Sequence, residues 1–155
     1  MATENPIEFI EQFDTVVISS ITSELMPHTS YAPFVDDDGK YYICISMMAL
    51  HTKNLLKTPK ASIMFIEDEI ETKSSFARNR VTFDVKVKNI NREESKFDEI
   101  MEHFRDKFGA KTEIYEQMGD FYLFEFTPFS GRAVFGFGKA YNFKDGEFSH
   151  IKRGM

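Results

Sequence analysis

One stretch of the chain, residues 81–88, alternates apolar and polar side chains at every position; its sequence is VTFDVKVK. Successive side chains of a β-strand point to opposite faces of the sheet, so this pattern indicates a strand with one buried face. Arg80 precedes the stretch and shares the polar face with Thr82 and Asp84. A strand of this kind constrains the fold strongly, because neighbouring strands must continue the sheet and a core must cover its apolar side.

Further β-rich segments surround this strand, and turn residues separate most of them. They are residues 15–20, 29–35, 41–46, 61–66, 121–126 and 132–141. Thr127-Pro128 is expected to end the strand at 121–126, and the two glycines within 132–141 are expected to mark a bulge or a close backbone approach. Nothing alternates strand, helix and strand as parallel sheets require. The sequence therefore predicts a mainly β protein of six or seven antiparallel strands closed into a barrel, with flanking helices.

Two or three helices are predicted around this sheet. Asn5 and Pro6 suit the cap and first position of a short N-terminal helix, and a basic helix is predicted at 52–57. The strongest helix is expected to open at Asn91, with Glu94 as its capping partner, and to stop at Gly109. Its apolar stripe indicates a core face and comprises Phe97, Ile100, Met101, Phe104 and Phe108.

Composition and length limit the function classes. The 155 residues predict one domain, 1–155, with a helix within 1–14 and a polar C-terminal tail at 142–155. The net charge of −6 disfavours nucleic-acid binding. No apolar run reaches the roughly 18 residues of a membrane span, and no signal peptide is visible. With a single cysteine, Cys44, no disulfide can form within the chain. A cytoplasmic protein is expected.

Two cationic clusters lie in the stretch 51–83. Lys53 and Lys57 are on the basic helix, and Arg78 and Arg80 open the alternating strand. Placed at the two ends of one antiparallel pair, they suggest a cradle for a phosphate or for carboxylates, since arginine binds oxyanions bidentately. The alternative for Arg80 is a salt bridge to Asp84 or to the acidic run 67–71.

Other reactive residues have structural alternatives. His51 could touch a cofactor or be a surface residue at a helix start, and Asp120 could be a turn residue or a ligand partner. His28 and His103 are expected to be structural or solvated, and no histidine shows the spacing of zinc ligands to another histidine or to a carboxylate. The acidic triplet 36–38 lacks the spacing of a calcium loop. No nucleophile–base pair is evident, so an enzyme of this sequence would take its chemistry from a cofactor.

Several segments together resemble the bacterial heme-utilisation proteins of the pyridoxamine-5′-phosphate-oxidase-like, FMN-binding split-barrel superfamily. They are SYAPFV (30–35), HTKNLLKTPKASIMFIEDE (51–69), FARNRVTFD (76–84) and GFGKAY (136–141). The resemblance covers roughly residues 15–150 in unchanged order. It implies a split β-barrel that works as a homodimer, with small-molecule sites in the clefts between subunits. Those clefts hold heme in the heme-utilisation branch, which some members degrade oxidatively, and FMN in flavin-binding relatives.

The resemblance also implies roles for particular residues. Arg80 matches a basic residue beside the cofactor, and Asp120 an acidic residue that supports an axial histidine across the dimer. Thr15 matches a threonine near the heme, and Lys53 is the natural contact to an FMN phosphate. The predicted catalytic residues are thus Arg80 and Asp120, and the predicted cofactor-binding residues are Thr15, His51, Lys53, Arg78, Arg80, Thr82 and His150.

The C-terminal tail departs from the family pattern. Heme-degrading members carry their axial histidine there, and the corresponding position in this chain falls at or near Met155. His150, the predicted ligand of the heme iron, corresponds to another tail histidine. Either His150 takes the axial role, Met155 is a thioether ligand, or heme is not ligated in the family's way. Three functions stay open: heme binding with oxidative degradation and iron release, an FMN-dependent oxidoreductase, and a dimer that carries heme or flavin without turnover.

Overall fold

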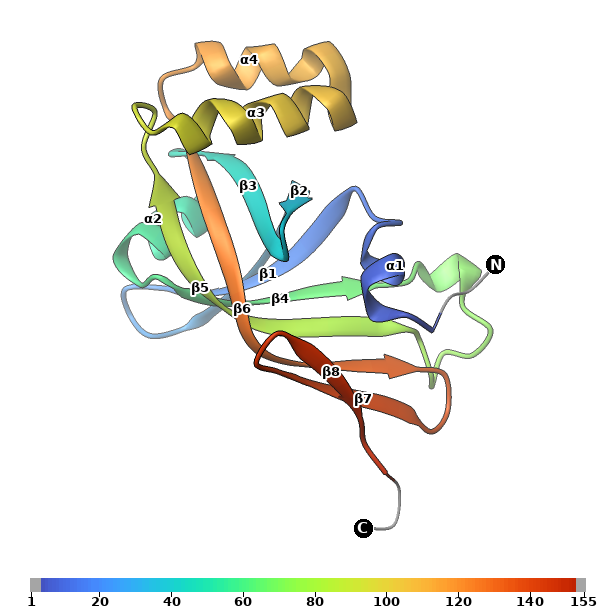
Figure 1. Cartoon of the computed structure of the whole chain (residues 1–155). Coiled ribbons are helices and arrows are strands. Elements are labelled where there is room, and N and C mark those ends of the chain that lie inside the picture. The colour runs from blue at the N-terminus through green and yellow to red at the C-terminus, as the bar shows by residue number, and fades with distance from the viewer. Residues whose placement is uncertain (1–3, 153–155) are drawn as a thin grey trace.

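The computed structural model describes residues 4–152, and a closed six-strand antiparallel barrel forms its centre (Figure 1). The strand order is β3-β2-β1-β4-β5-β6, and pairing of β3 with β6 closes the barrel. The strands are β1 (Thr15–Ile21), β2 (Pro27–Asp37), β3 (Lys40–Ser46), β4 (Lys60–Ile66), β5 (Arg80–Ile90) and β6 (Phe121–Phe135). Two further strands, β7 (Lys139–Lys144) and β8 (Glu147–His150), extend the sheet beyond β6. The predicted mainly β, antiparallel barrel is confirmed.

The barrel interior is filled by aromatic rings from four strands. Phe34 and Phe65 meet edge to face with centroids 5.0 Å apart, and Tyr41 stacks on Phe83 at 5.7 Å. All four side chains are at most 4% exposed. They occupy inward positions of their strands, as the alternation in β5 predicted, and Arg80, Thr82 and Asp84 lie on the outward face. Such ring pairs stabilise the folded state by more than the burial of their apolar surface alone.

Helix α1 (Pro6–Ile10) packs against the barrel with its apolar face. The side chain of Asn5 caps it by accepting hydrogen bonds from the backbone N–H groups of Ile7 and Glu8, as predicted. Phe9 and Ile10 are buried in the same core cluster as the barrel interior, where Phe9 meets the edge of the Phe135 ring. The helix thereby adds to the core that the strands enclose.

Helices α3 (Ser95–Phe108) and α4 (Thr112–Gln117) form a layer over β2 and β3 at the top of Figure 1. The expected helix start at Asn91 was wrong by four residues. The backbone N–H of Asn91 donates to Glu94 Oε2 at 2.7 Å, so the predicted bond exists, but it closes a turn that precedes the helix. The apolar stripe is confirmed as a core face that covers Tyr42 and Leu123.

The expectations for the C-terminal third need two corrections. Strand β6 does not end at Thr127-Pro128 but continues to Phe135, because Pro128 lies where its register with β5 shifts and no ladder bond is required. The predicted strand at 132–141 is instead divided by a turn, in which Gly136 and Gly138 have φ of 57° and 89°. The polar tail includes a strand, β8, that pairs with β7.

A search of residues 4–152 finds no helix that is long and apolar enough to cross a membrane.

Candidate functional site

The barrel is split on the side of β2 and β3. These strands pair only between residues 34–37 and 40–43, whereas the other edge of β3 pairs with β6 along residues 41–46. The gap contains a pocket of about 490 Å³, which α3 and α4 border. Its lining is mainly apolar and includes Tyr31, Pro33, Cys44, Phe104, Phe108, Tyr115 and Phe121, together with the polar residues Ser46 and His51. A pocket of this size and character suits a largely apolar ligand with a few polar groups.

A hydrogen-bonded corner lies beside the pocket, where β3 ends and β6 begins. Ser46 Oγ donates to Asp120 Oδ2 at 3.2 Å, and the backbone N–H of Met47 donates to the carbonyl oxygen of Asp120 at 2.7 Å. Thr52 Oγ1 donates to the carbonyl oxygen of Ser46 and ties α2 (Leu50–Lys57) to the same corner. The Asp120 carboxylate is thus held in place through its Oδ2 atom. Within residues 4–152, no hydrogen bond is formed by its other oxygen, Oδ1.

His51 lies inside the protein rather than on its surface. It is 9% exposed in the first turn of α2, and its Nδ1 shares a hydrogen bond with Ser30 Oγ at 2.8 Å. Burial, and secondarily the nearby His28, lowers the pKa of His51. The imidazole is therefore held neutral at the pocket wall. Because α2 begins at Leu50 rather than at Thr52, its buried face includes this residue.

The Cys44 thiol belongs to the apolar wall of the pocket. Burial raises the pKa of Cys44 to about 12, so the protonated form persists at neutral pH. A protonated, buried thiol is neither a nucleophile nor a metal ligand of consequence.

The predicted arginines lie together at the start of β5, and their donors are turned to backbone oxygens. Arg78 Nε donates to the carbonyl oxygen of Glu67 at 3.1 Å, and Arg80 Nη1 donates to the carbonyl oxygen of Arg78 at 2.9 Å. The alternative of a salt bridge from Arg80 to Asp84 or to the run 67–71 was wrong within the described residues. Asp84 instead accepts hydrogen bonds from two serine hydroxyls, those of Ser62 and Ser130.

The two cationic clusters do not form one cradle within a single chain. Lys53 and Lys57 are exposed on α2, which leads directly into β4. They therefore lie near the end of the β4–β5 ladder at which Lys60 pairs with Lys86. Arg80 pairs with Ile66 at the opposite end of the same ladder. Six residues of strand separate these ends, or roughly 20 Å. The clusters stand at two ends of one antiparallel pair, as the sequence predicted, but too far apart to hold one phosphate.

The remaining predicted residues are also dispersed. Thr15 is exposed and pairs with Pro33, which lines the pocket, whereas Thr82 lies on the outward face of β5. His150 ends β8, where its exposed ring meets the edge of the Tyr141 ring at 5.2 Å. Met155 falls outside the described residues. One chain therefore brings His51 close to the Ser46–Asp120 corner, and it keeps the arginines and His150 at the other end of β6.

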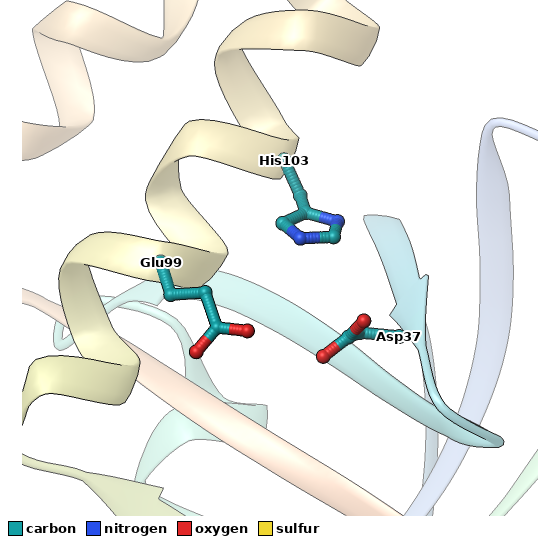
Figure 2. Close-up of side chains that lie close together, drawn as sticks. All are labelled: Asp37, Glu99 and His103. Atoms are coloured by element: carbon teal, nitrogen blue, oxygen red, sulfur yellow. The ribbon is translucent and has the colours of Figure 1, made fainter.

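Sequence reasoning missed one cluster of potential ligands, drawn in Figure 2. Asp37 at the end of β2 meets Glu99 and His103 of α3, and one ligand atom from each lies within 4.8 Å of the others. The expectation that no histidine and carboxylate have metal-ligand spacing was therefore wrong. Glu99 and His103 are four residues apart, which places them on one helix face. The third member, Asp37, is distant in sequence and gave no signal.

Comparison with known proteins places this arrangement in a family. The pattern of the family named Pyridoxamine 5'-phosphate oxidase matches residues 3–135. A heme oxygenase, HutZ of Vibrio cholerae serotype O1, is 35% identical over 150 residues, which are 95% of this chain and 85% of HutZ.

Solved structures agree with the sequence comparison. The crystal structure of HutZ, the heme storage protein from Vibrio cholerae, superposes with a TM-score of 0.80 at 34% identity, covering 95% of this chain and all of that one. Campylobacter jejuni ChuZ gives a TM-score of 0.86 at 32% identity over 94% of this chain, which spans 60% of the ChuZ chain. With its six-strand split barrel and these matches along nearly its whole length, the chain belongs to the pyridoxamine 5'-phosphate oxidase family, in the branch that contains HutZ.

Proposed function

We propose that this protein binds heme for heme utilisation, with the split between β2 and β3 as one wall of the binding cleft. The observation that carries the proposal is the largely apolar pocket of about 490 Å³ beside the Ser46–Asp120 corner, in a chain 35% identical to a heme oxygenase. Aromatic side chains suit the faces of a porphyrin, and a fixed carboxylate can hold an imidazole that ligates iron.

The residues present fit this ligand in kind. Tyr31, Phe108 and Tyr115 offer apolar contact area at the pocket, and Asp120 offers the carboxylate oxygen that no described residue engages. Bound heme would supply the iron and its oxygen chemistry. The chain's own part is to position: Ser46 fixes the Asp120 carboxylate, and the latter orients an imidazole by accepting its N–H. His150 is the proposed source of that imidazole.

The proposal requires two copies of the chain. Asp120 immediately precedes β6, whereas Arg80 pairs with Val134 close to the end of that strand, a strand length of roughly 46 Å. Arg80 and His150 of one subunit can approach Asp120 only from a second subunit. Tyr31, which lines the pocket but is 67% exposed, lies at a suitable contact surface.

Light scattering on the eluting protein tests the dimer. We expect a mass near twice the 18.0 kDa of one chain. Tyr31→Arg should yield monomers with weakened heme binding, and Ile114→Arg, on the exposed side of α4, should leave the dimer intact. A monomeric wild-type protein that binds heme at full affinity would exclude the shared site.

The decisive test of heme binding is a UV–visible titration of the apo-protein with hemin. We expect a saturable Soret shift at one heme per chain. His150→Ala should remove the axial-ligand signature, and Asp120→Asn should weaken it without loss of fold. His28→Ala is a matched control for a partly exposed histidine, and its spectrum should stay like the wild type. Arg80→Gln should lower affinity more than Lys144→Gln. An unaltered spectrum in His150→Ala would refute that ligand assignment.

Turnover is a separate question from binding. In the proposed oxidative function, ascorbate and O₂ should bleach the Soret band of the heme complex, with release of iron to a ferrous chelator. Persistence of the band with no released iron would instead indicate that the protein carries heme. Both outcomes are compatible with the same pocket.

FMN is the second candidate ligand, favoured by the match to the pyridoxamine 5'-phosphate oxidase family. In that case Lys53 of one subunit and Arg80 of the other would meet the phosphate, because they are at opposite ends of the β4–β5 ladder in a single chain. Titration with FMN, followed by flavin fluorescence after denaturation, distinguishes the two ligands. Tight FMN uptake without a specific heme spectrum would favour the flavin function.

A further inference from the structure

The cluster of Asp37, Glu99 and His103 lies where the end of β2 meets α3, and it plays no part in the heme proposal (Figure 2). Glu99 and His103 project from one face of α3 towards the strand end that bears Asp37. The three ligand atoms lie within 4.8 Å of one another. Donor atoms around a tetrahedral zinc ion are roughly 3.4 Å apart, so small side-chain rotations would bring these atoms to coordination distance.

Rigid elements hold the three side chains. Residues Ile100 and Met101, between Glu99 and His103, are buried in the core beneath α3 and fix the rotation of the helix. Asp37 is the last residue of β2 and pairs with Lys40 in the β2–β3 hairpin. The ligands therefore come from a helix and a strand end whose backbones are already ordered, which reduces the entropic cost of gathering them.

A cation already occupies the space between the carboxylates. Lys96 Nζ lies 2.8 Å from Asp37 Oδ2 and 3.4 Å from Glu99 Oε1. The hydrogen bond to Asp37 is the main cause of a raised pKa at Lys96. Lys96 lies one turn before Glu99 on the same helix and keeps a third of its side chain exposed, so it can withdraw into solvent.

We propose that Asp37, Glu99 and His103 form a binding site for a divalent first-row transition metal ion, with the Lys96 ammonium as its built-in competitor. One imidazole nitrogen and two carboxylate oxygens make a ligand set suited to Zn²⁺, Fe²⁺ or Mn²⁺, with water completing the shell. When the metal binds, the Lys96 ammonium moves away from the carboxylates, and the divalent ion takes its place between them. The site is independent of heme, since none of its residues lines the split pocket.

Isothermal titration of the full-length apo-protein with Zn²⁺ tests the proposal. We expect one ion per chain, and the same stoichiometry with Co²⁺ followed by its visible absorption. His103→Ala and Glu99→Gln should each weaken Zn²⁺ binding by roughly tenfold or more. Lys96→Met removes the competing ammonium at similar length and should tighten binding. Asp106→Asn, which removes another carboxylate from α3, is the matched control and should leave the affinity unchanged.

Thermal unfolding supplies a second readout. Zn²⁺ should raise the Tm of the wild-type protein, because a ligand that binds only the folded state stabilises it, and the rise should vanish in His103→Ala. Absence of saturable binding, or binding that His103→Ala leaves unchanged, would overturn the site. Unchanged affinity in Lys96→Met would overturn the competition. Because these measurements use protein free of heme, their failure leaves the proposed heme function untouched.

Discussion

Aromatic side chains line both the barrel interior and the pocket in the split, yet only the interior is closely packed. Inside the barrel, the rings of Phe34 and Phe65 are 5.0 Å apart and the neighbouring strands pair on both sides. In the split, β2 and β3 part after four pairs, and about 490 Å³ stays open beneath α3 and α4. The difference lies chiefly in strand pairing. Space for a ligand arises where β2 and β3 no longer pair with each other.

Removing an interior ring should give the largest effect. Phe83→Ala deletes a ring that is 1% exposed and packs against Tyr41 and Phe65, so the free energy of unfolding should fall by about 3–5 kcal/mol. Phe108→Ala, at the partly buried pocket edge, should cost only about 1 kcal/mol, since water already approaches its site. Urea unfolding of both variants measures the difference. Equal losses would mean that the pocket is packed as tightly as the interior.

Alkaline pH should weaken the fold through groups in both regions. Burial raises the pKa of Cys44 from 9.0 to about 12, and it also raises the pKa values of Tyr41 and Tyr42 above the usual 10.0. The unfolded chain loses these protons first, so the contribution of these three groups to stability is constant below pH 9 and falls as pH rises through this window. Cys44 alone should contribute about 1.4 kcal/mol for each pH unit between 9 and 12.

Urea unfolding at pH 8, 9.5 and 11 checks the alkaline prediction, and Cys44→Ala isolates the thiol. That variant should lose less stability than the wild type between the first two points, since the tyrosines titrate later. A wild-type protein whose stability is the same at all three pH values would contradict the burial of these groups.

Filling the pocket should affect binding more than stability. Cys44→Leu adds volume to the wall of a space that is already open, so the free energy of unfolding should change by no more than about 1 kcal/mol. Hemin affinity should fall by roughly tenfold or more, which corresponds to about 1.4 kcal/mol. The paired control is Gly131→Ala in β6, where an added Cβ would lie 2.4 Å from the Thr82 carbonyl oxygen and should destabilise the sheet without touching the pocket. Unimpaired hemin binding in Cys44→Leu would place the ligand elsewhere.

The smallest expected effect is the acid sensitivity of His51. Burial lowers its pKa below 6.5 in the folded state, so its contribution is present above pH 6.5 and is lost as pH falls through the lowered value. In this pH range the unfolded state binds a proton at His51 and the folded state does not, so protonation favours unfolding. His51→Gln should flatten the stability profile between pH 7 and 5. Parallel slopes for wild type and His51→Gln would argue against a buried neutral imidazole.

The sequence predicted what depends on local pattern and missed what depends on distant partners. The alternation around Phe83 gave the strand, its faces and its place in a closed sheet, and the stripe around Ile100 gave the core side of α3. Pro128 misled because a bulge, set by pairing with β5, removes the usual penalty for proline in a strand. His51 and Asp120 were named, but the contact of Asp120 with Ser46 at the pocket depends on the β3–β6 pairing. The role of Asp37 as a potential ligand was missed for the same reason, since its partners lie on α3, far along the chain.

The pairing of β3 with β6 also has a kinetic consequence. It joins Tyr41 to Phe126, 85 positions apart (126 − 41), so the barrel closes only after most of the chain is available. Loop-closure entropy must be overcome before these contacts form, and such non-local pairings slow folding. On the ribosome, β3 would wait with one unpaired edge until residues 121–126 emerge. During that interval the strand is exposed to mispairing with other chains, and the speed of closure governs how much protein reaches the native state.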